Sequence, residues 1–132
     1  MKIAVGTDDR KTVSKGHFDE SRYFVVIELL NAEVMGREIR DNPVVEGQKT
    51  KARHGQIDAI IHLLEDCNLF MGRSIGKDSV DKISFCGVDC ISTTIEGIDD
   101  AVCSYLDGKL ERFSYYSPDT KEYLPCAQRS YT

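Results

Sequence analysis

The sequence has no apolar run that approaches the roughly 18 residues needed by a membrane-spanning helix. It also has no block of basic residues, and its formal charge of −5 argues against a nucleic-acid partner. Met1 and Lys2 lead directly into Ile3-Ala4-Val5, an opening typical of a strand and not of a signal peptide. We therefore expect a cytoplasmic protein without membrane or nucleic-acid contacts.

Zinc-site and disulfide spacings are also missing, although the chain has five cysteines. No Cys-x-x-Cys pair occurs, and no second pair follows Cys86 and Cys90 at zinc-site spacing. An odd number of scattered cysteines without an export signal favours reduced thiols. We expect Cys67, Cys86, Cys90 and Cys103 to be small buried hydrophobic residues, and Cys126 remains unassigned.

The chain has the composition of one ordinary globular domain. Its 132 residues are 41% hydrophobic and 30% charged, enough to bury a single core without disulfides. No internal repeat or low-complexity segment occurs. We predict one domain over residues 1–112 and a C-terminal tail, residues 113–132, for which the polar and aromatic sequence predicts no structure.

Strand and helix patterns alternate along the domain. The predicted strands cover residues 2–7, 23–30, 33–39, 67–71 and 88–92. The predicted helices are residues 56–66, a segment opened by residues 72–76 that ends near 86, and a segment capped by Thr93 that runs to about 107. The element order is therefore β-β-β-α-β-α-β-α.

This order predicts an α/β fold with one five-stranded mixed sheet. Alternating strands and helices imply parallel strands with right-handed crossovers, and the second and third strands should form an antiparallel hairpin. Helices should cover both faces, giving three α/β/α layers. Ligands in such sheets lie beyond the carboxyl ends of the parallel strands, which are residues 7–9, 71–72 and 92–93 here.

Three histidines could serve as metal ligands or proton carriers. His17 stands in the polar loop 10–21, at the expected ligand edge, and we predict a functional role for it. His54, in the long loop 40–55, and His62, on the polar side of the first helix, are expected to be ordinary surface residues. We expect both loops to be mobile.

The segment Gly72-Arg73-Ser74-Ile75-Gly76 leads from a strand into the second helix. Such a turn exposes backbone N–H groups at the positive end of a helix and can bind an anion, and Arg73 would add a donor fork. Close packing of the helix on the sheet explains the glycines equally well. The segment is too short for a P-loop and has no lysine.

Four carboxylates, those of Asp8, Asp9, Asp19 and Glu20, gather near the same edge. They could hold magnesium for phosphoryl transfer, although turn formation and solvated charge are the favoured explanation. No Ser-His-Asp or Cys-His spacing argues for covalent catalysis. We expect a protein that is not an enzyme, with a magnesium-dependent phosphoryl-transfer enzyme as the alternative.

Taken together, several segments resemble the dinitrogenase iron–molybdenum cofactor biosynthesis family, which includes NifX, NafY and the C-terminal domain of NifB. The resemblance covers roughly residues 1–112, and the order and spacing of its short pieces make it specific. The pieces are Met1-Lys2-Ile3-Ala4-Val5, Ser14, His17-Phe18, Arg22-Tyr23-Phe24, Asn42-Pro43, Gly72-Arg73-Ser74-Ile75-Gly76, Gly87-Val88-Asp89 and Thr94-Ile95-Glu96, with Ala101 and Gly108.

The resemblance implies a ribonuclease-H-like fold and an accessory role of the nitrogen-fixation type. Such a protein binds, carries or stores a metal–sulfur cluster, of the iron–sulfur or iron–molybdenum precursor type. It then exchanges the cluster with a donor or acceptor protein. By resemblance His17 is the metal ligand. The predicted cofactor-binding residues are His17, Phe18, Gly72, Arg73, Ser74 and Gly76.

Asp19 follows His17-Phe18 where the family usually has glycine. A carboxylate beside an anionic cluster repels it unless the chain turns the carboxylate away. This residue therefore favours a third hypothesis, a regulatory or scaffold module whose cluster site is vestigial.

Overall fold

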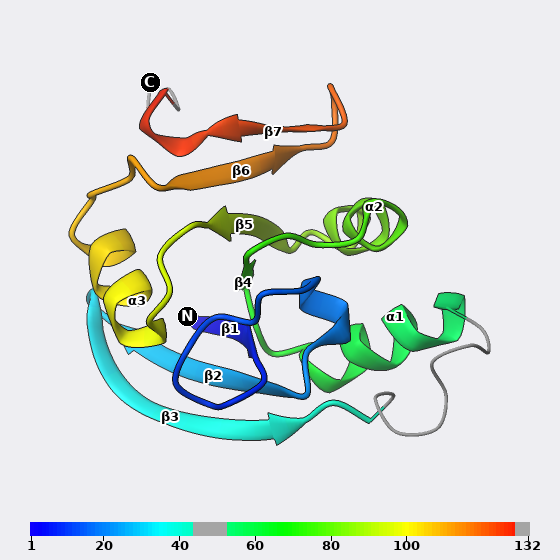
Figure 1. Cartoon of the computed structure of the whole chain (residues 1–132), viewed down its shortest axis with the longest axis horizontal. Coiled ribbons are helices and arrows are strands. Elements are labelled where there is room, and N and C mark those ends of the chain that lie inside the picture. The colour runs from blue at the N-terminus through cyan, green and yellow to red at the C-terminus, as the bar shows by residue number, and fades with distance from the viewer. Residues whose placement is uncertain (44–52, 129–132) are drawn as a thin grey trace.

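Figure 1 shows the computed structural model of the chain, which describes residues 1–43 and 53–128. Its elements are β1 (Lys2–Thr7), a 3-10 turn η1 (Phe18–Glu20), β2 (Tyr23–Leu30), β3 (Glu33–Asp41), α1 (Arg53–Leu63), β4 (Leu69–Gly72), α2 (Lys77–Phe85), β5 (Asp89–Thr93), α3 (Ile98–Leu106), β6 (Phe113–Ser117), β7 (Glu122–Pro125) and η2 (Cys126–Gln128). No helix in these ranges is long and apolar enough to cross a membrane.

All strands join one mixed sheet with the order β3-β2-β1-β4-β5-β6-β7. β1, β4 and β5 are parallel neighbours, and the remaining pairs are antiparallel. This arrangement confirms the mixed sheet and the hairpin of the second and third strands. The description as ribonuclease-H-like stays a prediction.

The predicted number of five strands is wrong, because the sheet has seven. The two additional strands, β6 and β7, come from the tail for which the sequence predicted no structure (Figure 1). Each is short, and β6 becomes a strand by pairing with β5 through Ile91–Tyr115 and Thr93–Phe113. Such pairing depends on the neighbouring strand more than on local propensity, so the local pattern did not reveal it.

The C-terminal hairpin is also attached to α2. The Tyr116 hydroxyl of β6 donates a hydrogen bond to the Asp81 carboxylate, and this bond raises the pKa of Tyr116 to about 12. The rings of Tyr116 and Tyr123 pack edge to face with centroids 5.5 Å apart. The hairpin therefore covers part of the face on which α2 lies.

Two apolar cores lie on opposite faces of the sheet, because successive strand side chains alternate between faces. α3 packs on one face, over Ile3, Val5 and their neighbours, through Ile98, Ala101 and Val102. α1 and α2 pack on the other face, whose core contains Phe18, Phe24, Val26, Ile57, Ile60, Leu64, Phe70, Val80 and Ile83. The helices on both faces confirm the three predicted layers (Figure 1).

The long loop predicted over residues 40–55 is shorter in the structure. β3 continues through Asp41, and α1 begins at Arg53, so His54 belongs to the first turn of this helix. Residues 44–52 lie outside the described residues, as does the His54 side chain. His62 lies on α1 with its side chain 83% exposed, as predicted for a surface residue.

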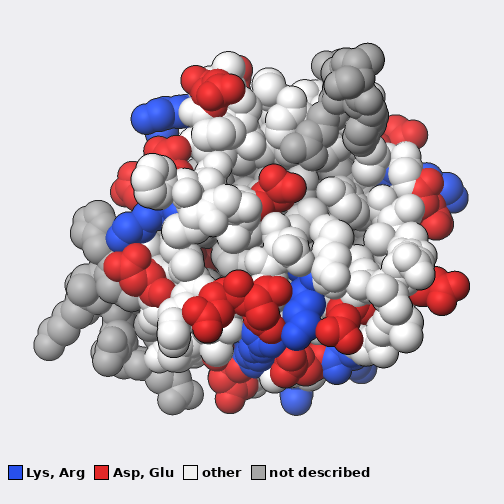
Figure 2. Space-filling view, turned by 180° about the vertical axis from the view of Figure 1, so that it is seen from behind, with Lys and Arg blue, Asp and Glu red and all other residues white. Residues whose placement is uncertain are grey.

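An ion-pair network joins the edge strand β3 to the segment between α1 and β4. Arg40 donates from Nη1 to Asp66 Oδ1 at 2.7 Å and from Nη2 to Asp66 Oδ2 at 2.8 Å. Lys2 Nζ adds a hydrogen bond of 3.0 Å to the same carboxylate. The face seen from behind shows basic side chains interspersed among acidic ones (Figure 2). The Arg40 and Lys2 hydrogen bonds hold the pKa of Asp66 well below its usual range.

We expect Asp66→Asn to lower the free energy of unfolding by about 1 kcal/mol at pH 7, because it breaks a paired guanidinium–carboxylate contact that is partly exposed. Asp66 has a lower pKa in the folded state than in the unfolded state. Its contribution is therefore complete above about pH 4 and decreases as the pH falls further. Urea denaturation at pH 7 and pH 3 should show that the difference between wild type and variant narrows at pH 3.

The matched control is Glu65→Gln, because Glu65 has a side chain 70% exposed and contacts only His62 among the ion pairs of the described residues. This change should alter stability much less. Equal losses for the two variants would contradict the role assigned to Asp66.

Candidate functional site

The candidate site lies at the carboxyl edge of the parallel strands, where the chain after β1 crosses to the chain after β4. His17 and Ser74 form a parallel β-bridge, and Phe18 N donates to Ser74 O at 2.8 Å. His17 was predicted to stand at this edge, and the bridge places it beside the turn that leads from β4 into α2.

The same loop is also attached to the chain after β5. Thr12 and Gly97 form an antiparallel bridge. Val13 N donates to Glu96 O at 2.7 Å, and Ile98 N donates to Lys11 O at 3.0 Å. The loop 10–21, which we expected to be mobile, is thus tied by backbone hydrogen bonds to both neighbouring loops.

Two of the clustered carboxylates shape the turn that follows β1. Asp9 Oδ1 accepts hydrogen bonds from Lys11 N at 2.9 Å and Thr12 N at 2.7 Å, an arrangement that lowers the pKa of Asp9 strongly. Asp8 accepts from the Ser14 hydroxyl and from Arg22 N, each at 3.0 Å. These contacts show both carboxylates engaged in turn formation, as the favoured explanation predicted.

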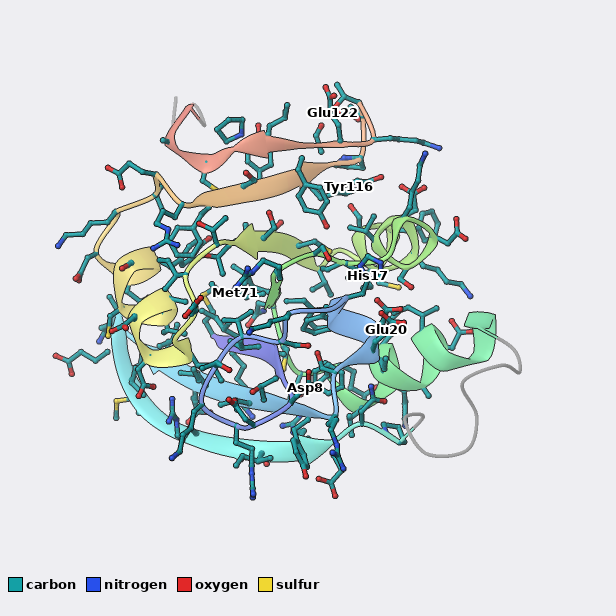
Figure 3. All side chains as sticks on the ribbon, in the orientation of Figure 1. Asp8, His17, Glu20, Met71, Tyr116 and Glu122 are labelled. Atoms are coloured by element: carbon teal, nitrogen blue, oxygen red, sulfur yellow. The ribbon has the colours of Figure 1, made fainter. Side chains whose placement is uncertain are left out.

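The His17 imidazole is exposed, and its position is set by one side-chain contact. Nδ1 lies 2.9 Å from Ser74 Oγ. If Nδ1–H donates to this oxygen, the Nε2 lone pair remains free for a metal. Figure 3 shows His17 beside the start of α2. No group of three or more His, Cys, Asp or Glu side chains within metal-binding distance occurs in the described ranges.

Phe18 is fully buried, although it was predicted to contact a cofactor. Its ring stacks on Phe70 with centroids 5.0 Å apart and packs against Phe24 at 4.9 Å. A Cβ on Gly72 would lie 3.2 Å from the Phe18 Cβ, so glycine allows this close approach. Phe18 therefore packs in the core beneath His17, and Gly72 leaves room for its ring.

Gly76 and Asp19 meet at the beginning of α2. Gly76 N donates to Asp19 Oδ1, and the Ser79 hydroxyl donates to Asp19 Oδ2, both at 3.3 Å. A carboxylate from within the chain thus occupies the helix end that was predicted to receive an anion. Sequence reasoning missed this contact because its partners are 57 and 60 residues apart in the chain.

Arg73 lies between Gly72 and Ser74 and is half-buried. Its Nε is buried and has no hydrogen-bond partner among the described residues. A buried donor of this kind favours an acceptor from outside the chain. Of the six predicted residues, the structure brings together an exposed imidazole, its Ser74 partner and the neighbouring Arg73, with the other three in packing and capping positions.

No disulfide joins any of the five cysteines. Cys67 and Cys90 are buried as predicted, and burial raises the pKa of each thiol to about 12, so both remain protonated. Cys126 is buried in the core on the α3 face of the sheet. The prediction for Cys86 and Cys103 is wrong, since both are exposed, one at the end of α2 and one on the outer side of α3.

Comparison with known proteins gives the family of the chain and solved structures that share its fold. The sequence model of a family described as dinitrogenase iron-molybdenum cofactor matches residues 1–108. A relative from Methanocaldococcus jannaschii, described as uncharacterized, is 27% identical over 115 residues, which cover 86% of this chain and 92% of the relative.

Two solved structures share the fold. The crystal structure of MJ0327 from Methanocaldococcus jannaschii has a TM-score of 0.65 and 18% identity, and the match covers 89% of this chain and 95% of the other. The NMR structure of TM1290 from Thermotoga has a TM-score of 0.59 and 17% identity, with 84% and 91% covered.

The fold is a small α/β domain with an exposed imidazole at the carboxyl edge of its parallel strands. The chain belongs to the dinitrogenase iron–molybdenum cofactor family. Membership associates it with the biosynthesis or binding of a cofactor of that type.

Phe18→Ala should lower the free energy of unfolding by about 3–5 kcal/mol, because it leaves a cavity between Phe24 and Phe70. Chemical denaturation followed by circular dichroism measures this loss. Phe85→Ala is the control, since Phe85 is 93% exposed and should change stability by less than about 0.5 kcal/mol. A stability loss at Phe18 as small as that of the control would show that its ring is not a core residue.

Proposed function

We propose that this protein binds a metal–sulfur cluster at His17 and carries it between a donor and an acceptor protein. Family membership supports a cargo of the iron–sulfur or iron–molybdenum type. The observation that carries the proposal is the exposed His17 imidazole with Nδ1 held 2.9 Å from Ser74 Oγ. With Nδ1 engaged by Ser74, Nε2 is the ring nitrogen left to bind a metal.

The ligand set fits a cargo that is held briefly. Within the described residues no group of three or more His, Cys, Asp or Glu side chains lies within metal-binding distance, so a cluster bound at His17 would keep most of its metal positions open. Those positions stay available to the ligands of a donor or acceptor protein. Arg73 supports the proposal because it is a cation next to Ser74, and its Nε has no acceptor among the described residues. It would attract sulfide or oxygen atoms of the cargo.

The enzyme alternative, magnesium-dependent phosphoryl transfer, receives no support from the acidic residues. The carboxylates of Asp8, Asp9 and Asp19 each accept hydrogen bonds from their own loops or from α2. The hypothesis of a vestigial site rested on Asp19, and its carboxylate is turned toward Gly76 and Ser79. Neither observation favours these alternatives over a carrier.

His17→Ala should reduce cluster uptake at least about tenfold, because it removes the proposed ligand. The measurement is anaerobic reconstitution with a synthetic iron–sulfur donor, followed by visible absorption and metal analysis. His62→Ala is a matched control, since this histidine is exposed on α1 and its ion-pair partner is Glu65. Equal uptake by wild type and His17→Ala would show that His17 is not the ligand.

Ser74→Ala should keep the imidazole but remove the contact that orients it, so uptake should fall by about threefold to tenfold without a change in fold. The same reconstitution measures this effect, and NMR of the His17 ring should show increased motion. Ser104→Ala on α3 provides the control. Unchanged uptake together with an unchanged ring signal would contradict the orienting role of Ser74.

A further inference from the structure

The first turn of α2 is capped from a distant part of the chain. Gly76, at the cap position, has no side chain that could accept a hydrogen bond from the free N–H groups. Asp19 supplies the acceptor, with Oδ1 on Gly76 N and Oδ2 on the Ser79 hydroxyl, both at 3.3 Å. An ideal Cβ on Gly76 would lie 3.5 Å from Asp19 Oδ1, so the carboxylate sits directly over the helix end.

The Asp19 carboxylate reduces the positive charge at the carboxyl edge of the sheet. The N-terminal end of a helix carries about half a positive charge, which a fixed carboxylate offsets. Asp19 is half-buried and held by two hydrogen bonds, so solvent screens its charge less than that of the exposed Glu20 and Asp78. The exposed Lys15 and Lys77 are likewise solvated and weakly effective.

His17 is close to two charged residues, to Asp19 along the chain and to Arg73 across the bridge. It precedes Asp19 by two residues and bridges to Ser74, the residue after Arg73. A metal species bound at His17 Nε2 is therefore exposed to both charges. Arg73 is the only cation among the predicted site residues. The negative charge of Asp19 opposes it and so decides how strongly the site attracts anions.

We infer that Asp19 is a specificity-determining residue that sets the charge of the cargo. The site discriminates against polyanionic species, such as oxyanions and dianionic metal sulfides. It favours metal species that are neutral or cationic where they meet His17. This inference rests on the proposed function, because it assumes that cargo binds at His17, and it narrows the chemical class of that cargo.

The test compares two probes of opposite charge on the whole chain. Tetrathiomolybdate is a dianionic metal sulfide, and Co²⁺ is a cation that binds imidazole. Dissociation constants for both come from NMR titrations that follow the His17 ring and the Gly76 amide. The variants are Asp19→Asn, which keeps an acceptor for Gly76 N but loses the charge, and Asp107→Asn. The latter makes the same change in net charge at the exposed end of α3.

Asp19→Asn should bind tetrathiomolybdate about threefold to fivefold more tightly and Co²⁺ more weakly by a similar factor. Asp107→Asn should change neither affinity. If Asp19 only caps the helix, Asp19→Asn should weaken the binding of both probes. That result would overturn the inference, as would unchanged affinities or the absence of binding of either probe.

The two proposals fail in different experiments. If His17→Ala abolishes cluster uptake while Asp19→Asn leaves the ratio of the two affinities unchanged, the carrier function stands and the charge selection is wrong. If His17→Ala has no effect on uptake, the assigned ligand is wrong whatever happens at Asp19.

Discussion

The insertion of Phe18 into the core is the interaction on which the site depends. Its ring fills the space between Phe24 of β2 and Phe70 of β4, under a glycine that lets the two backbones approach. The burial of this ring fixes the residues on both sides of it. His17 is left at the surface beside Ser74, and Asp19 is directed to the start of α2.

The three loops after the parallel strands behave as one unit because backbone hydrogen bonds join them. The loop after β1 contacts the loop after β4 through His17 and Ser74, and the loop after β5 through Thr12 and Gly97. A carrier built in this way would present its ligand from a rigid edge, so the imidazole would lose little freedom on binding. Exchange of cargo would then depend on the open metal positions and less on movement of this loop.

The strands and helices of residues 1–108 could be predicted because their signals are local. The run Tyr23–Leu30 and the spacing of the buried Ile57, Ile60 and Leu64 on the first helix depend on neighbours within a few residues. The hairpin of β6 and β7 could not be predicted this way. Its aromatic segment becomes a strand only because β5 offers an edge to pair with.

By itself the sequence determined the order of elements from β1 to α3, the sheet edge that carries His17 and the family resemblance, since these follow from local pattern and from the order and spacing of short motifs. Only the tertiary structure decided which site residues face solvent. It placed Phe18 in the core, set Gly72 against its ring and directed the Asp19 carboxylate to α2. The reason is physical: the contacts of Phe18 with Phe70 and Gly72 and of Asp19 with α2 join segments more than 50 residues apart, and no local pattern records them.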